Sequence, residues 1–82
     1  MSTPFSMEWI IITEGKENRV NEDDNLFELR YEGYKLFPLN ELLELRKYPF
    51  SKQTGYAVIE ELVLKEQSTL CKYRLISLHT VN

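Results

Sequence analysis

The chain of 82 residues contains one cysteine, Cys71, and one histidine, His79. A single cysteine excludes a framework of intramolecular disulfides and fits a reducing compartment. A structural zinc site needs four ligands, mostly Cys and His, and the chain has only one of each, so we expect no zinc site. A catalytic cysteine needs a base within hydrogen-bond reach, and His79 lies at the far end of the same predicted strand. The sequence therefore predicts neither metal nor thiol chemistry.

Long hydrophobic runs are also missing. No window approaches the roughly 18 apolar residues of a membrane-spanning helix. Residues 1–7 have no basic region and no apolar stretch, so we expect a flexible terminus and no secretory signal. The length allows one domain, residues 1–82, with one modest core. We expect a cytoplasmic protein that does not associate with a membrane.

Glycine is scarce, and the three glycines lie too far apart to cradle a phosphate in one loop. The sequence contains no nucleotide-binding, nucleophile-elbow or zinc-protease motif. Glu60 and Glu61 are adjacent, and on a regular strand they point to opposite faces, which prevents them from acting as a carboxylate pair. These absences predict that the protein is not an enzyme and carries no cofactor.

Alternating and β-branched runs dominate what remains. Residues 8–13, 26–31 and 34–37 read as short strands, with Gly33 supplying the turn between the last two. Residues 55–65 and 69–77 flank a tight polar connection and predict an antiparallel hairpin. The register of the first strand of this hairpin changes at Glu60–Glu61, which predicts a β-bulge or a bend. We expect an all-β domain, a small, strongly bent antiparallel sheet or open barrel of five or six strands with at most one short helix.

Residues 39–48 fit two structures. As a helix, the segment would be capped by Asn40 and would gather Leu39, Leu42 and Leu43 in one stripe. As a strand, it would turn Leu43 and Leu45 inward. The run is close to the length at which isolated helices are marginal, and its neighbours on both sides are strands, so we favour a strand.

An acidic segment shows part of a calcium-loop spacing. Asn21, Asp23, Asn25 and Glu32 stand at loop positions 1, 3, 5 and 12. The position that requires glycine for the sharp turn holds Leu26, so we expect no calcium binding.

Cys71 alternates in phase with Tyr73 and Leu75, which predicts that its side chain packs in the core as a small hydrophobe.

Charge is unevenly distributed along the chain. Residues 1–41 carry nine carboxylates and four basic groups, a balance of −5, and residues 42–82 carry four and six, a balance of +2. On a small barrel, basic residues of the second half near aromatic rings would form a groove for a polyanion. Charges on the outer faces of edge strands also serve to prevent aggregation, which is the simpler interpretation. The candidate polyanion-binding residues are Arg46, Lys47, Lys52, Lys72 and Arg74.

Four short strings suggest a relationship. They are Thr13-Glu-Gly-Lys16, Glu32-Gly-Tyr34, Gly55-Tyr-Ala-Val-Ile59 and Tyr73-Arg-Leu-Ile-Ser-Leu78. With them the chain resembles a small uncharacterised family of short proteins from Bacillus-type Gram-positive bacteria, a domain of unknown function. The resemblance implies a cytoplasmic bacterial protein and a strand over Leu42–Lys47, and it supplies no activity or site residue.

The sequence thus predicts a non-enzymatic interaction module that binds a protein partner or itself. The alternative is a nucleic-acid-binding β-barrel associated with RNA or translation. The two differ in whether the basic residues converge on one face or an exposed apolar surface is present instead.

Overall fold

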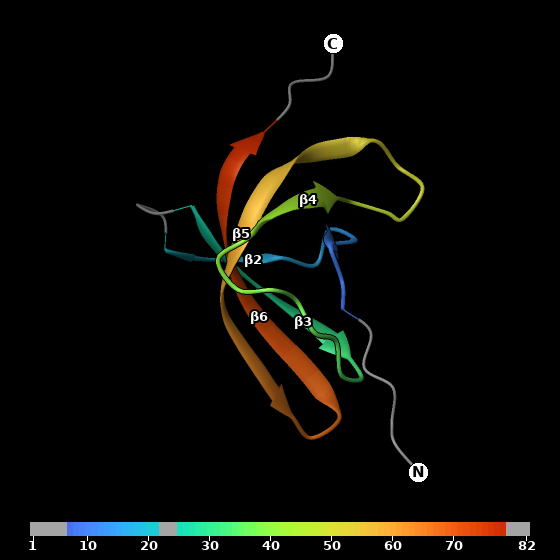
Figure 1. Ribbon diagram of the computed structural model, residues 1–82, viewed down its shortest axis with the longest axis vertical. Helices are drawn as coiled ribbons and strands as arrows, with labels where there is room; N and C mark the ends of the chain where they lie inside the picture. The colour runs from blue at the N-terminus through green and yellow to red at the C-terminus, as the bar shows by residue number, and fades with distance from the viewer. Residues whose placement is uncertain (1–6, 22–24, 79–82) are drawn as a thin grey trace.

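Six strands account for most of the chain in the computed structural model, which describes residues 7–21 and 25–78 (Figure 1). Most of the strands are rich in β-branched, aromatic or leucine residues, the composition that suits a half-buried pleated surface, and β2 is the polar exception. Their bounds are β1 Ile10–Ile12, β2 Asn18–Asn21, β3 Leu26–Glu32, β4 Leu42–Arg46, β5 Gln53–Lys65 and β6 Ser68–Leu78.

The strands form one sheet in the order β1-β4-β5-β6-β3-β2. The sheet curls into a half-barrel, which confirms the all-β prediction (Figure 1). All neighbouring pairs are antiparallel except β1 and β4, which run parallel with Ile11 opposite Leu45. The sheet is therefore mixed, and the parallel pair was not part of the expected antiparallel arrangement. A parallel pair needs a long connection between its strands, and residues 13–41 provide one between β1 and β4.

The predicted hairpin is confirmed as β5 and β6, the two longest strands. Glu66 and Gln67 form its turn with φ angles of 52° and 61°. Positive φ at both central residues is typical of the type I′ turn, whose twist matches that of the flanking strands. The register shifts between Ile59 and Glu61, so the bulge predicted at Glu60–Glu61 is also confirmed.

Residues 42–46 form strand β4, as the strand interpretation predicted. Leu43 and Leu45 are buried on its inner side. Asn40 adopts a φ of 61° in the turn before the strand and caps no helix.

The strand predicted over residues 34–37 is wrong. Only Leu36 pairs there, in an isolated bridge with Met7. The reason is topological, because β3 and β4 are separated in the sheet by β5 and β6, and the chain that joins them crosses the sheet instead of lengthening it. The buried Thr69 hydroxyl holds this crossing segment, since it donates to the Gly33 carbonyl at 2.7 Å and accepts from the Lys35 N–H at 2.8 Å.

The core lies on the concave side of the sheet. A side-chain bond connects the two sides of the half-barrel: the Tyr31 hydroxyl on β3 donates to the Ile12 carbonyl on β1 at 2.9 Å. Burial raises the pKa of Tyr31 far above its ordinary value, which keeps this donor protonated. The buried apolar side chains are Ile11, Leu29, Phe37, Leu43, Leu45, Ala57, Ile59, Cys71 and Tyr73.

Candidate functional site

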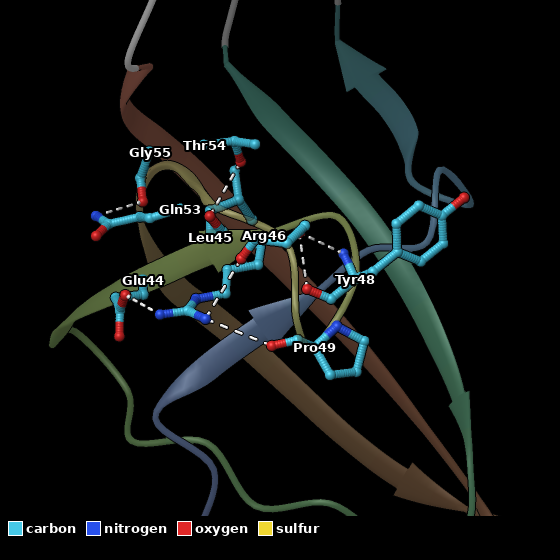
Figure 2. A network of polar contacts seen from close by, with 9 residues as sticks. Glu44, Leu45, Arg46, Tyr48, Pro49, Gln53, Thr54 and Gly55 are labelled. Atoms are coloured by element: carbon cyan, nitrogen blue, oxygen red, sulfur yellow. Dashed lines mark hydrogen bonds and ion pairs between the residues drawn. The ribbon is translucent and has the colours of Figure 1, made fainter. Parts of the chain in front are cut away.

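The loop between β4 and β5, Lys47–Lys52, is built around the side chain of Arg46. The Arg46 Nη2 lies 3.0 Å from the Glu44 carboxylate, and its Nη1 donates to the carbonyls of Pro49 and Ser51 at 3.4 Å (Figure 2). A guanidinium holds several donors in one plane, so a single side chain can fix the carboxylate and both loop carbonyls. The loop is therefore anchored to the end of β4.

Ser51 closes the loop from the other side. The Tyr48 N–H donates to Ser51 Oγ at 3.0 Å, and that hydroxyl donates back to the Tyr48 carbonyl at 2.8 Å. The Ser51 N–H also donates to the Tyr48 carbonyl, at 3.1 Å. Below the loop, the Thr54 hydroxyl donates to the Leu45 carbonyl at 3.0 Å and ties β5 to β4. These local bonds satisfy loop backbone groups that regular strand pairing leaves free.

This ordered loop holds apolar rings in water. Phe50 is 101% exposed and Tyr48 is 50% exposed. Figure 2 shows the Tyr48 ring turned away from the contacts around Arg46. Lys47 and Lys52 are exposed at the two ends of the loop, and the Lys47 ammonium lies 5.8 Å from the centre of the Tyr48 ring. Large aromatic side chains exposed next to cations are typical of binding surfaces.

The structure brings only part of the predicted polyanion site together. Arg46, Lys47 and Lys52 lie at the loop, whereas Lys72 and Arg74 lie within β6. The latter two are on one face of that strand, as expected, because the intervening Tyr73 is buried.

The basic residues of β6 are matched by the carboxylates of the β5 bulge. The Lys72 ammonium lies 3.4 Å from Glu61, and the Arg74 Nη2 donates to Glu60 at 3.4 Å. Glutamates are thus interleaved with the basic residues on the outer face of the sheet, and binding of a polyanion there stays a prediction.

A pocket that the sequence did not reveal opens beside the loop, inside the half-barrel. It has a volume of about 320 Å³ and reaches from the β1–β2 connection to the end of β6. Apolar side chains form much of its surface, and charged groups from two different segments accompany them. The lining residues are Thr13, Gly15, Glu17, Arg19, Phe27, Leu45, Lys47, Thr54, Tyr73, Leu75 and Leu78.

Cys71 is buried in the core beside Tyr73, so its predicted position is confirmed. Burial, followed by the negative charge of Glu28, raises the pKa of the Cys71 thiol to about 12. The thiolate is the nucleophilic form of cysteine, and a thiol with this pKa stays protonated near neutral pH.

The metal predictions fall partly outside the described residues. Across residues 7–21 and 25–78, no group of three or more His, Cys, Asp or Glu side chains could hold a metal ion. Asp23 and His79 lie beyond these ranges, so the calcium and zinc expectations stay predictions. In the same described part of the chain, no helix is long and apolar enough to cross a membrane.

Two features of this region were not found from the sequence. The exposure of Phe50 depends on the loop geometry that Arg46 imposes, and the only sequence signal is an aromatic residue between Pro49 and Ser51 in a short loop. The pocket depends on which strands become neighbours, and no local pattern indicates that.

Comparison with known proteins places the chain in a group without an assigned activity. A family model described as a domain of unknown function, DUF2584, matches residues 1–82. The uncharacterized protein YtmB of Bacillus subtilis (strain 168) is 37% identical over 82 residues, which is 100% of both chains. The X-ray crystal structure of YtmB, a structural-genomics target, superposes with a TM-score of 0.89 and 36% identity over 100% of this chain and 99% of that one. These matches confirm the resemblance noted from the sequence, and the chain belongs to the DUF2584 family of proteins of unknown function.

Proposed function

We propose that this protein is a non-enzymatic cytoplasmic interaction module that binds a partner protein through the β4–β5 loop. The observation that carries the proposal is the complete exposure of Phe50 on a loop fixed by Arg46 and Ser51. A few aromatic and arginine side chains dominate the binding energy of protein interfaces. A loop whose backbone is already ordered loses less conformational entropy on binding than a flexible one.

The charges around the ring favour one kind of partner surface. Lys47 and Lys52 flank Phe50 at the two ends of the loop. Complementary charge across an interface accelerates association and selects among partners. We therefore propose a partner with an apolar pocket for Phe50 and carboxylates around that pocket.

Self-association through the sheet edges is less well supported than a separate partner. The edge strands β1 and β2 contain only three and four residues. β2 also carries two asparagines and an arginine among those four residues. Short, polar edge strands discourage pairing between sheets.

Nucleic-acid binding is the weaker alternative. Arg46, Lys72 and Arg74 already contact Glu44, Glu61 and Glu60. A phosphate backbone would have to displace these carboxylates or accept their repulsion. We expect no appreciable binding to random single-stranded RNA at about 0.15 M salt, a condition that matters because phosphate contacts weaken steeply with salt.

The test is a quantitative capture from native lysate with and without nuclease, followed by binary binding of each purified candidate. The baits are the wild-type protein, Phe50→Ser and the control Val20→Ser. Val20 is 45% exposed on β2, at the edge of the sheet. Capture of a true partner is unchanged by nuclease and by Val20→Ser. Its affinity for the Phe50→Ser variant is at least tenfold lower than for the wild-type protein. Both variants should fold, because substitutions at exposed positions change stability by only about 0.5 kcal/mol.

A third variant tests the role of loop order. Arg46→Gln removes the guanidinium donors to Pro49 and Ser51 and leaves Phe50 itself unsubstituted. We expect faster loop motion by nitrogen-15 relaxation and weaker partner binding. Capture that is unchanged by Phe50→Ser refutes the proposed surface. Capture that disappears with nuclease and also in the Lys72→Gln/Arg74→Gln double variant makes nucleic-acid binding the better assignment.

A further inference from the structure

Glu17 lines the pocket beside the β4–β5 loop, and one oxygen of its carboxylate has no hydrogen-bond partner in the described part of the chain. Glu17 Oε1 is buried, and no group in the described part of the chain donates to it. A buried anionic oxygen without a donor is costly, because it has lost its water and gained no replacement. A cationic group bound in the pocket would offset this cost by neutralising the charge of the Glu17 carboxylate.

The negative charge of Glu17 acts on the aromatic floor of the same pocket. Tyr73 is 2% exposed, and its pKa is raised first by burial and then by the charge of Glu17. The Tyr73 ring stacks on Phe27 with centroids 5.5 Å apart and planes at 16°. The Arg19 guanidinium lies 4.7 Å from the centre of the Phe27 ring, on the pocket wall. One side of the pocket is thus an ordered stack with a carboxylate beside it.

The other side of the pocket combines an apolar surface with one cationic side chain. Leu45, Leu75 and Leu78 supply aliphatic surface, and Lys47 lines the same cavity. The backbone of Lys47 is fixed, since the Glu14 N–H donates to its carbonyl at 2.8 Å. A cavity of about 320 Å³ falls at the lower end of the range for small-molecule sites, about 300–1,000 Å³.

We propose that this pocket binds a small zwitterion with an apolar side chain, of the class of the aliphatic α-amino acids. The ammonium group donates to Glu17, the carboxylate faces the positive charge of Lys47, and the aliphatic side chain covers the leucine surface. Each chemical part of such a ligand has a matching group in the lining. A simple fatty acid would bring a second anion beside Glu17, and a simple amine would bring no anion to the two cations of the lining, Arg19 and Lys47.

The test uses three probes of one shape: leucine, 3-methylbutylamine, which lacks the carboxylate, and 4-methylpentanoate, which lacks the ammonium. Each is titrated into nitrogen-15-labelled protein, and shifts are followed at the amides of residues 17, 27, 45 and 73. We expect saturable binding of leucine, binding of the amine at least tenfold weaker, and no binding of the acid. Equal binding of all three probes, or preference for the acid, overturns the proposal.

Glu17→Gln tests the carboxylate with almost no change in volume. It should reduce leucine affinity at least tenfold, while Glu14→Gln, an exposed carboxylate 3.4 Å from Lys16, should leave it unchanged. Lys47→Gln should reduce the affinity for leucine and leave the affinity for 3-methylbutylamine unchanged. The Glu17 variant should fold, because Oε1 has no hydrogen bond to lose in the described structure. If it does not fold, the three-probe series on the wild-type protein decides the question. No saturation by leucine at millimolar concentration also overturns the proposal.

Discussion

Replacing Tyr31 by phenylalanine removes a side-chain bond that connects β3 to the backbone of β1. The Tyr31 hydroxyl donates to the Ile12 carbonyl at 2.9 Å, while the ring packs with Phe37 at a centroid distance of 5.7 Å. Tyr31→Phe keeps the ring and deletes only the donor. Strand β1 is then held in the sheet by its parallel pairing with β4.

The magnitude follows from what the deletion leaves behind. A buried carbonyl that loses its donor costs about 1–3 kcal/mol, and Ile12 is only half-buried, so water can replace part of the bond. We expect a loss of about 1–2 kcal/mol. For a domain of this size, each kcal/mol lowers the melting temperature by about 4–8 °C.

The assay is urea unfolding followed by circular dichroism, with amide hydrogen exchange of β1. The denaturant slope should stay constant while the midpoint falls, and protection should decrease first at Ile11 and Ile12. Tyr48→Phe is the matched control, because that ring is 50% exposed and no hydroxyl bond of it is described. An unchanged midpoint in Tyr31→Phe, or an equal fall in Tyr48→Phe, would show that the bond does not hold the half-barrel together.

Three further predictions concern the core and the turns. Cys71 should resist thiol reagents until the protein unfolds. Folding raises the pKa of the Cys71 thiol from 9.0 to about 12, so the urea concentration at the unfolding midpoint should stay constant below pH 9 and decrease above it. The decrease should be smaller in Cys71→Ala. Gly55→Ala should destabilise by about 1–3 kcal/mol in the same assay, since a Cβ there would lie 2.1 Å from the Ser77 carbonyl oxygen. Glu66→Asn with Gln67→Gly should raise the melting temperature, because these residues suit the positive φ angles of the turn.

Local patterns predicted most strands but missed β2, because its sequence Asn-Arg-Val-Asn has no apolar alternation although it pairs with its sequence neighbour β3. The β5–β6 hairpin and its bulge follow from alternation interrupted at Glu60–Glu61, and the burial of Cys71 follows from its phase with Tyr73. β4 was predictable because Leu43 and Leu45 alternate with charged residues. In each case the information lies within about ten residues, which is the range over which periodicity is informative.

Contacts between distant segments were beyond such patterns. The parallel pairing of Ile11 with Leu45 depends on the crossing segment that carries Phe37 over the core. That same crossing prevented residues 34–37 from pairing as a strand. The pocket gathers Glu17 and Leu78 from opposite ends of the chain, and neither residue signals a site by itself. The pocket was not predicted because it is a product of the topology.

The charge asymmetry of the sequence has a different meaning in the folded protein. Ion pairs form within each half of the chain: Lys16 with Glu14 and Lys35 with Glu8 in the first, and Arg46, Lys72 and Arg74 with three glutamates in the second. Of the six basic residues in the second half, these pairs leave Lys47, Lys52 and Lys65. Two of those three flank Phe50. The excess positive charge is thus concentrated beside the exposed ring and is not spread along a groove, an arrangement that suits an acid-rimmed pocket on a protein better than an extended phosphate backbone.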